Sequence, residues 1–414
     1  MVRPAAVPLR PCAIEPAIAA DDVGEVHKAR AACLDRTVAV TARGEARPEW
    51  SIARKVEALE AFVARKEDLK RTAPLRYLFW ESTLRCNLTC LHCGSDCVRD
   101  DASRERELDA DTVKRELCSI AKAYPAHQMT FAMIGGEPLL RQDVPEVGAY
   151  AAGLGYGWGI TTNAMLLDRS MVRRLRDARL RTISVSLDGV EADHDRLRNH
   201  PGCYRTVTRH LRSLLEDRFF DRFDVICCVS RINVDHLEEF MEELLRLEVP
   251  AVRFTPVFSR GRAGRNANLM LGNADITKML DFVARQRASQ SRINVCLSEE
   301  GYYGPRWECV VRDELHYCAS GIQIGTILHD GAVTGCPSVS RRFLEGSVRD
   351  APFVEIWKTG FSRYRQDRKR SFSRLCGDCD HWVLCEGGGF HLLDQDDVSR
   401  GFCCLEKTGQ NRRT

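Results

Sequence analysis

The 414-residue sequence lacks the features that mark several protein classes. No stretch approaches the roughly 18 uninterrupted apolar residues of a membrane-spanning helix. Prolines, arginines and a glutamate interrupt the first twenty residues, so no signal peptide is indicated and we expect a cytoplasmic protein. Basic and acidic residues number 61 and 58, a balance that gives no support to nucleic-acid binding. No glycine-rich phosphate loop occurs in a suitable context, so nothing points to phosphate-bearing cofactors.

Cysteine, in contrast, is abundant, with 19 residues in the chain. Because the cytosol keeps thiols reduced, a cysteine-rich chain of this kind binds metal more often than it forms disulfides. Most of the cysteines fall into groups: Cys86, Cys90, Cys93 and Cys97; Cys309, Cys318 and Cys336; Cys376, Cys379 and Cys385; and Cys403 with Cys404. The grouping predicts metal centres, whereas the isolated cysteines are expected to be buried core residues.

Between about residues 75 and 257 the sequence alternates short apolar runs with amphipathic stretches. The runs predict six strands: Leu75–Phe79, Met129–Ile134, Gly157–Thr161, Thr182–Leu187, Asp224–Val229 and Ala251–Phe254. The stretches between and after them predict helices at Asp109–Ala123, Val144–Leu154, Arg169–Ala178, Thr206–Glu216 and Asp235–Leu247. Six strand–helix repeats indicate an α/β fold, a parallel sheet whose right-handed crossovers curl into a full or partial barrel. Function is then expected at the carboxyl ends of the strands.

The regions that flank this pattern are less regular. Before it, the sequence predicts a strand at Thr37–Thr41 and a helix from Ile52 to Leu69. After it, a helix at Ile276–Ala288 leads into a loop-rich, cysteine-rich third, in which metal would supply part of the stability. We expect four parts, namely a mostly helical extension (1–74), a barrel (75–263), a bridging region (264–305) and a C-terminal domain (306–414).

The strongest motif is Cys86-Asn-Leu-Thr-Cys90-Leu-His-Cys93, a CxxxCxxC in the loop after the first predicted strand. Three thiolates this close can hold three irons of a [4Fe–4S] cluster and leave the fourth iron open. A zinc site is the alternative, with Cys97 as the fourth ligand that zinc usually takes.

Further motifs follow the ends of successive strands: Gly135-Gly136-Glu137-Pro138, Thr161-Thr162-Asn163 and the segment from Ser184 to Gly189. With the cysteine triad, this ordered series resembles the radical S-adenosylmethionine (radical SAM) family, which is built on a partial (β/α)6 barrel. The resemblance implies that Cys86, Cys90 and Cys93 hold a [4Fe–4S] cluster whose open iron is chelated by SAM. One-electron reduction would split SAM and give a 5′-deoxyadenosyl radical that abstracts hydrogen from a substrate. It also implies SAM contacts for His92, Gly135, Gly136, Glu137, Pro138, Thr162, Asn163, Ser186, Arg198 and Asn233.

The C-terminal third resembles the SPASM extension of that family, which carries two auxiliary [4Fe–4S] clusters. The matching residues are Cys318, Gly331 and Cys336 for its opening signature, and Cys376, Cys379, Cys385 and either Cys403 or Cys404 for its second half. The resemblance assigns the first auxiliary cluster to Cys309, Cys318 and Cys336, and the second to Cys376, Cys379, Cys385 and Cys403 (or Cys404). A zinc ribbon built on Cys376 and Cys379 is the alternative.

One position departs from the SPASM pattern. Gly389 stands where the family has the cysteine that completes the first auxiliary cluster. Either His391 or the spare C-terminal cysteine substitutes for it, or one iron stays open. An open iron would bind a heteroatom of the substrate while a neighbouring carbon loses hydrogen.

Two enzymatic functions fit these features. The first is the maturation of a ribosomally made peptide through a thioether, C–C or C–O cross-link. The second is the dehydrogenation or epimerisation of a small natural product, such as a sugar, aminoglycoside or cyclitol alcohol. Both would use the auxiliary clusters as electron acceptors and a flavodoxin or ferredoxin as reductant. A purely electron-carrying protein is disfavoured, because the SAM motifs would then have no task.

The first function raises the question of how a precursor peptide would be recognised. The 75 residues before the barrel lack the strand and helix pattern of a fused leader-peptide-binding domain. A separate leader-peptide-binding protein is therefore the expected partner if the substrate is a peptide.

Overall fold

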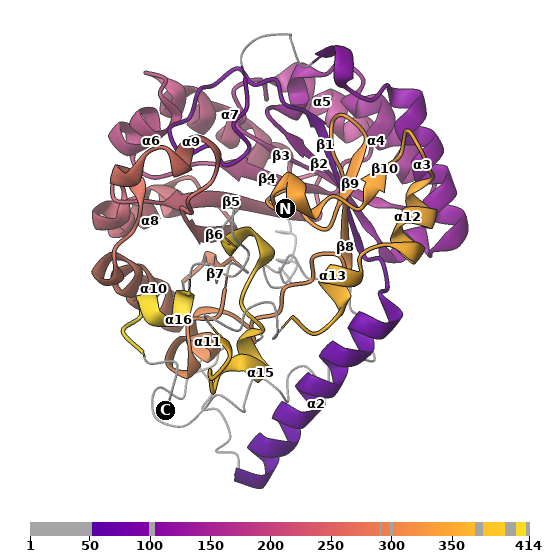
Figure 1. Ribbon diagram of the computed structural model, residues 1–414. Coiled ribbons are helices and arrows are strands. Elements are labelled where there is room, and N and C mark those ends of the chain that lie inside the picture. The colour runs from indigo at the N-terminus through magenta and orange to yellow at the C-terminus, as the bar shows by residue number, and fades with distance from the viewer. Residues whose placement is uncertain are drawn as a thin grey trace, which may run out of the picture.

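A ten-stranded sheet forms the centre of the described chain (Figure 1). The computed structural model describes residues 52–98, 104–289, 291–298, 301–313, 315–368, 376–393 and 403–410. The strands are β1 (Tyr77–Thr83), β2 (Thr130–Gly135), β3 (Gly157–Thr162), β4 (Thr182–Ser186), β5 (Arg222–Val229), β6 (Ala251–Pro256), β7 (Asn294–Leu297), β8 (Ile324–Ile327), β9 (Ala332–Thr334) and β10 (Gly346–Ser347). Their order in space is β10-β9-β8-β1-β2-β3-β4-β5-β6-β7. In the described part of the chain the edge strands β10 and β7 do not pair with each other, so the sheet is open, as a partial barrel requires.

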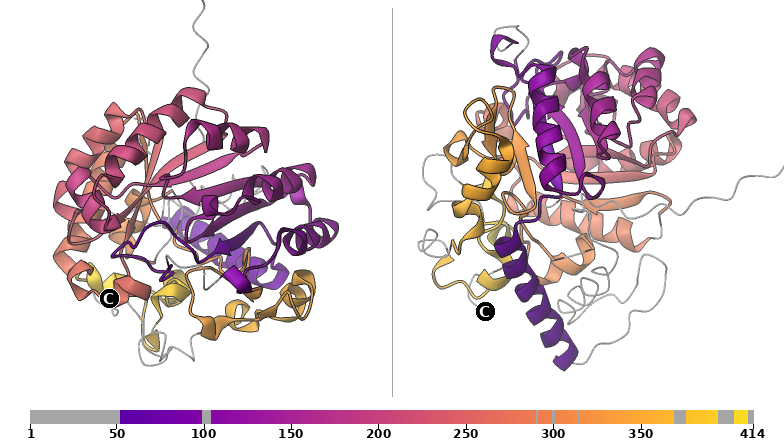
Figure 2. Two further views of the ribbon diagram at one scale, coloured as in Figure 1. Left: turned by 90° about the horizontal axis from the view of Figure 1, so that it is seen from above. Right: turned by 90° about the vertical axis from the view of Figure 1, so that its right-hand side faces the viewer.

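From β8 through β1 to β7 every neighbouring pair of strands is parallel. Strand β9 runs antiparallel to both of its neighbours, β8 and β10. Parallel neighbours need crossover connections, and helices supply them. The larger helices are α2 (Ile52–Thr72), α3 (Ala110–Ala123), α4 (Val144–Gly153), α5 (Arg169–Asp177), α6 (Glu191–Arg198), α7 (Cys203–Asp217), α8 (Leu237–Arg246), α10 (Asn273–Ala288), α11 (Pro305–Val311) and α12 (Phe353–Thr359). Helices α3 to α8 lie along the outer side of the sheet (Figures 1 and 2).

Helix α3 shows how the sequence produces these crossovers. Asp109 caps its first turn by accepting a hydrogen bond from the Thr112 backbone nitrogen at 2.7 Å. Val113, Leu117 and Ile120 recur at helical spacing and are buried. The helix therefore begins at a cap and buries one apolar stripe against the sheet.

The strand and helix pattern predicted for residues 75–257 is confirmed, since β1 to β6 and the helices α3, α4, α5, α7 and α8 lie close to the expected positions, whereas the short helix α6 was not predicted. The predicted first strand starts two residues too early and ends four too early, because β1 runs from Tyr77 to Thr83. Strands β7 to β10 were not predicted. Each has only two to four residues, too few for a recognisable alternation of apolar and polar positions.

The predicted helical character of the N-terminal region is also confirmed, because α2 covers Ile52–Thr72. The strand predicted at Thr37–Thr41 lies outside the described residues. No helix in the described ranges combines the length and apolar character needed to cross a membrane.

The C-terminal part of the chain completes the sheet and packs on the barrel. Strand β8 pairs with β1 in register, Tyr77 opposite Ile324 and Trp80 opposite Ile327. Helix α12 packs against α3, where the backbone nitrogen of Phe353 donates to Glu116 at 2.8 Å. The Phe353 ring stacks on Trp357 with ring centroids 5.8 Å apart. The hydrogen bond joins α12 to α3, and the buried Phe353 ring also packs on β8, where a Cβ on Gly325 would lie 2.6 Å from the ring.

The substitution Phe353→Ala tests this contact. Removing a fully buried phenylalanine ring should cost about 3–5 kcal/mol of stability and lower the Tm of the protein. Lys358→Ala, an exposed position on the same helix, is the control and should change stability by less than about 0.5 kcal/mol. Equal Tm values for the two variants would contradict the packing described above.

Candidate active site

The concave face of the sheet is partly open. Trp158 faces the helix layer, because a Cβ on Gly148 of α4 would lie 2.4 Å from its ring. Strand residues on the opposite face therefore point into the barrel. Ser186 on β4 and Thr161 on β3 face inward and keep partial exposure in mid-sheet, while their neighbours are buried. The inner face of the sheet, called the lumen below, thus presents partly accessible polar side chains at the ends of β3 and β4.

The CxxxCxxC segment forms a loop at the carboxyl end of β1, above this lumen. The Cys86 backbone nitrogen donates to Val98 O at 2.8 Å and Val98 N donates to Leu84 O at 3.0 Å, which closes the loop at its base. Arg262 of helix α9 (Gly261–Gly264) holds the other side, because its Nε donates to Cys90 O at 3.0 Å. Backbone contacts therefore fix the loop on two sides.

Glycine at position 261 makes this second contact possible. Its φ is +55°, and a Cβ there would lie 2.5 Å from the carbonyl oxygen of Gly94. The Arg262 backbone nitrogen donates to Cys93 O at 2.9 Å. A larger residue at position 261 would push α9 away from the cysteine loop.

The loop thiols have unequal environments. Burial raises the pKa of Cys86 to about 11. The Cys97 thiol donates a hydrogen bond to Cys93 and lowers the pKa of Cys93 to about 6. Within the described residues, no three His, Cys, Asp or Glu side chains come close enough to hold a single metal ion. Cys97 therefore supports Cys93 by hydrogen bonding.

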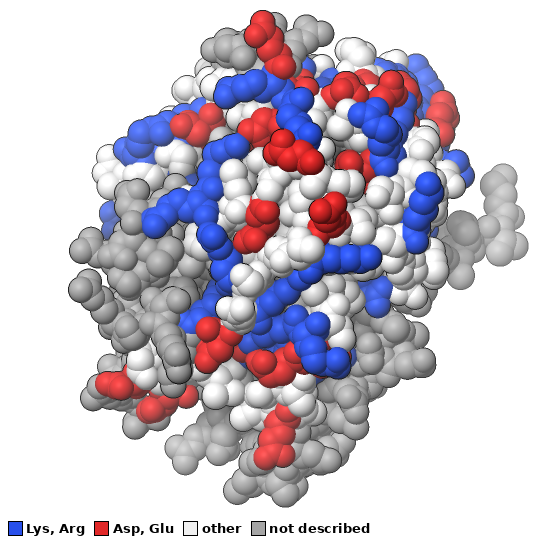
Figure 3. Space-filling model, turned by 45° about the vertical axis from the view of Figure 1, so that its right-hand side comes forward, with Lys and Arg blue, Asp and Glu red and all other residues white. Residues whose placement is uncertain are grey.

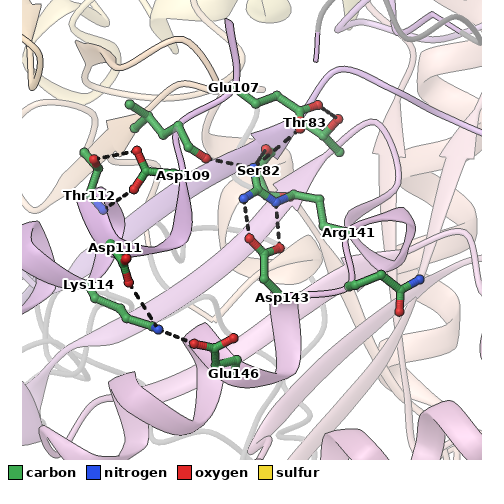
Figure 4. Close-up of polar contacts among 12 residues, drawn as sticks. Ser82, Thr83, Glu107, Asp109, Asp111, Thr112, Lys114, Arg141, Asp143 and Glu146 are labelled. Carbon is green, nitrogen blue, oxygen red and sulfur yellow. Dashed lines mark hydrogen bonds and ion pairs between the residues drawn. The ribbon is translucent and has the colours of Figure 1, made fainter. Parts of the chain in front are cut away.

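A polar network supports the end of β1 beneath the loop (Figure 4). Arg141 forms a bidentate pair with Asp143, at 2.9 and 2.5 Å. The same guanidinium donates to the carbonyls of Ser82 and Leu108, each at 3.0 Å. Glu107 lies 3.6 Å from Arg141 and accepts a hydrogen bond from Thr83. The chain that leads into the cysteine loop is thus held before the first cysteine.

Glu137 connects the ends of β2 and β3. This carboxylate is fully buried and accepts hydrogen bonds from Thr162 Oγ1 at 2.8 Å, Asn163 N at 2.8 Å and Leu139 N at 3.1 Å. Asn163 then donates to Asn87 at 2.8 Å, inside the cysteine loop. Both oxygens of Glu137 are used within the protein, so its observed role is to position the strand ends.

The glycines before Glu137 allow a close backbone approach. A Cβ on Gly136 would lie 2.0 Å from Arg85 O, and Gly135 has a φ of +144°. Only glycine fits these two positions without strain. Pro138 begins the short 3-10 turn Pro138–Leu140 that follows.

Asp188 is the centre of a second buried network, at the end of β4. Arg198 Nε lies 2.6 Å from Asp188 Oδ2, and His92 Nε2 lies 3.4 Å from the same oxygen. Burial alone would raise the pKa of Asp188, but Arg198, His92 and His194 outweigh it, so the pKa is lowered. Arg198 Nη1 also lies 3.7 Å from Cys90 Sγ. Through Asp188, this network brings Arg198 of α6 close to His92, which lies within the cysteine loop. Both are predicted site residues.

Asn233 lies in the same region but is turned into the protein. Its side chain is 1% exposed and accepts from Ser230 N at 2.7 Å. Its amide donates to Asp188 O at 2.5 Å and to Cys228 O at 2.9 Å. The observed contacts of Asn233 therefore tie the end of β5 to the end of β4.

The cysteines predicted for the first auxiliary cluster are partly described. Cys318 precedes β8, and Cys336 follows β9. Cys309 lies in α11, and its side chain is outside the described part of the structure. Gly389 has a φ of −71° and directly precedes the 3-10 turn Phe390–Leu392. The His391 ring lies 4.7 Å from the ring of Phe258, in the loop after β6.

The cysteines of the second group lie together. Burial, followed by the neighbouring thiols of Cys403, Cys376 and Cys379, raises the pKa of Cys385 to about 12. Cys404 is turned into the core, where a Cβ on Gly301 would lie 2.4 Å from its Sγ. These four cysteines thus lie near one another, and four cysteines are the donor set that a [4Fe–4S] cluster takes.

The sequence analysis missed several polar residues near the carboxyl end of β1. His329, in the turn between β8 and β9, lies with Nδ1 2.9 Å from Glu81 Oε2 of β1. Arg260 donates to Val339 O, and the charges of Cys336 and Glu81 act on its pKa, which burial lowers. A glutamate inside the apolar run of β1 was the signal that could have identified Glu81.

Two family models match this chain. The "Radical SAM superfamily" model matches residues 80–244, and the SPASM model, an "Iron-sulfur cluster-binding domain", matches residues 318–380. The predicted radical SAM and SPASM domains, and with them SAM and [4Fe–4S] clusters as cofactors, are confirmed.

Relatives and solved structures agree with this assignment. Fe-coproporphyrin III synthase of Methanosarcina barkeri is 27% identical over 333 residues, covering 74% of this chain and 81% of the relative. Mycofactocin maturase MftC of Mycobacterium ulcerans is 28% identical over 321 residues, covering 75% and 82%. The structure of anSMEcpe with bound AdoMet and Cp18Cys peptide has a TM-score of 0.61 at 18% identity, covering 81% of this chain and 95% of that one. Streptococcus suis SuiB bound to precursor peptide SuiA has a TM-score of 0.61 at 16% identity, covering 89% and 83%.

The substitution Glu137→Gln tests the link between β2 and β3. An amide in place of one carboxylate oxygen would face an N–H donor and cost about 1–3 kcal/mol locally. We expect weaker SAM binding, because the Gly135–Pro138 segment would shift, as measured by equilibrium dialysis with the reconstituted protein. Thr162→Ser keeps the hydroxyl and is the control. Wild-type SAM affinity in Glu137→Gln would contradict this role.

Proposed function

This chain combines a radical SAM domain with a SPASM domain, and we propose that it oxidatively modifies a ribosomally made peptide. One observation carries the proposal. The pairing of β8 with β1 places the strand that leads into the Cys86–Cys93 loop beside the β8–β9 hairpin, which Cys318 precedes and Cys336 follows. A radical centre and an electron acceptor attached to neighbouring strands of one sheet suit a net two-electron oxidation.

The chain's own groups bind and orient SAM. When bound, the cluster of the CxxxCxxC loop supplies the electron that splits SAM into methionine and a 5′-deoxyadenosyl radical. We assign the backbone carbonyls of Gly135 and Gly136 to the SAM amino group, and Ser186 and Arg198 to its carboxylate. Asn233 acts by positioning Asp188, because its side chain is occupied by backbone groups.

The auxiliary ligands follow from the contacts of the thiols. We assign the second auxiliary cluster to Cys376, Cys379, Cys385 and Cys403, and leave Cys404 in the core. Cys318 and Cys336, with Cys309, hold the first cluster. With these ligands, the auxiliary clusters would accept the second electron that the substrate loses.

Oxidation of the substrate also releases a proton. We assign the Glu81–His329 pair as the acceptor of this proton. Both side chains are largely buried at the edge shared by the cysteine loop and the hairpin. Their mutual contact uses Oε2 of Glu81 and Nδ1 of His329. Glu81 Oε1 and His329 Nε2 are the atoms that would hold the proton.

Peptide maturation is supported by relatives. MftC is named a maturase, and SuiB and anSMEcpe have been solved with peptides bound. Oxidation of a small molecule is the second candidate, because other relatives are named Fe-coproporphyrin III synthase and AdoMet-dependent heme synthase. Arg260, close to Glu81, would suit a substrate that carries carboxylates.

Mass spectrometry of reactions with both substrate classes separates the two functions. Anaerobic holoenzyme, SAM and dithionite would be combined with precursor peptides encoded near the gene, or with Fe-coproporphyrin III. A peptide that loses two hydrogen masses while 5′-deoxyadenosine accumulates supports maturation. A change confined to the porphyrin overturns it in favour of the second candidate, and failure to cleave SAM overturns both.

Iron and sulfide quantification after anaerobic reconstitution tests the cofactor assignment. The wild-type protein should hold about twelve irons, and a variant with Cys86, Cys90 and Cys93 changed to alanine about eight, at four per cluster. About four irons in the wild type and none in the variant would mean that the C-terminal cysteines hold no clusters.

The substitution Gly389→Cys tests whether the first auxiliary cluster has an open iron. The φ of −71° at this position is one that cysteine adopts freely, so the protein should assemble. We expect unchanged iron content and SAM cleavage, with substrate turnover reduced because the open iron would be capped. His391→Ala is the companion variant, and its loss of iron would identify a substitute ligand. Unchanged turnover in Gly389→Cys would contradict a role for an open iron.

A further inference from the structure

We propose that the buried ion pair between Lys66 of α2 and Glu386 sets the reduction potential of the auxiliary cluster at the Cys376–Cys385 loop. The proposal rests on the proposed function in one respect, namely that these cysteines hold a [4Fe–4S] cluster. It assigns a role to a helix in which the sequence shows no recognisable motif.

The environment of Lys66 is unusual for a lysine. Its side chain is 2% exposed, although lysine is almost never fully buried unless it is paired. Nζ donates to Val383 O at 2.6 Å and lies 3.0 Å from Glu386 Oε1. Burial lowers the pKa of Lys66 and Glu386 opposes this effect, so the carboxylate helps to keep the ammonium charged.

These contacts fall directly on the cysteine loop. Val383 and Cys385 belong to the short helix α15 (Trp382–Cys385), and Glu386 is the next residue. Lys66 and Val383 are 317 positions apart in sequence, so the fold brings the cation to this loop. Figure 1 shows α2 passing close to α15 at the lower end of the molecule. One charge of the pair is thus adjacent in sequence to an assigned ligand.

The physical effect follows from the charge that reduction adds. An added electron is stabilised by a nearby cation and destabilised by a nearby anion, and a buried pair is only weakly screened by solvent. The net charge around an iron–sulfur cluster is one of the factors that set its potential. Loss of the Lys66 charge should therefore lower the potential, and loss of the Glu386 charge should raise it.

The chain offers matched controls for this effect. Lys70 also lies 3.0 Å from Glu386 Oε1, but it pairs in addition with Glu67, whose side chain is 62% exposed. The Lys70 side chain is 10% exposed and that of Lys66 only 2%, so solvent screens the Lys70 charge more, and Lys70→Met should shift the potential less than Lys66→Met. Lys66→Arg keeps the charge and should keep the potential close to the wild-type value.

The experiment is an EPR-monitored redox titration of the anaerobically reconstituted full chain. Lys66→Met, Lys66→Arg, Glu386→Gln and Lys70→Met would be compared with wild type, and repeated with Cys86, Cys90 and Cys93 changed to alanine so that only auxiliary clusters report. We expect a more negative midpoint for Lys66→Met and a more positive one for Glu386→Gln. A merely structural tether would alter stability in both variants without shifts of opposite sign.

Iron content separates the possible failures. Auxiliary iron at about eight per chain with unshifted midpoints would overturn the ion-pair proposal and leave the proposed function standing. Midpoints that move in the same direction in both charge-removing variants would overturn it as well. Absence of C-terminal iron in wild type would contradict the proposed function, and this proposal with it.

Discussion

The arrangement of the site depends on the hydrogen bonding of one strand, β1. It pairs in parallel with β2 on one side and with β8 on the other. Because parallel strands end at the same edge, the cysteine loop after β1 and the turn after β8 must lie together. The first pairing is local to the barrel, whereas the second joins positions about 250 residues apart. Strand pairing therefore sets the spacing between the CxxxCxxC loop and the β8–β9 hairpin, the two parts of the chain to which we assign iron ligands or their neighbours.

Within this frame, the cysteine loop has little regular structure and is held by polar contacts. Arg262 holds its outer side, and Arg198 approaches Cys90 from helix α6. Burying such charges is costly unless each has a partner, and Asp188 supplies one for Arg198. Glu137 likewise accepts three hydrogen bonds rather than leaving a buried carboxylate unpaired. The charges that shape the loop are thus stabilised by one another before any cofactor binds.

The sequence predicted this site unevenly, for physical reasons. Strands β1 to β6 and the motifs that end them were predictable, because each rests on local alternation and local spacing. The Glu81–His329 pair was not, because it joins residues 248 positions apart and only tertiary pairing brings them together. The role of Asp188 could not be assigned from the sequence, since its ion pair with Arg198 forms only when α6 packs on the loop. Cys403 and Cys404 could not be separated by spacing, whereas burial beside Gly301 distinguishes them.

Helix α2 extends the same reasoning to the N-terminal region. A helix stabilised only by its own turns would have no need to bury a lysine, because desolvation of the ammonium opposes folding. Lys66 is nevertheless buried, and its partners belong to the loop of Cys385. The cost of burial is offset only when that loop is folded, and the loop itself has few regular elements without a cofactor. The packing of α2 and the folding of the loop around Cys385 are therefore coupled, so the first described helix and this cysteine loop stabilise each other.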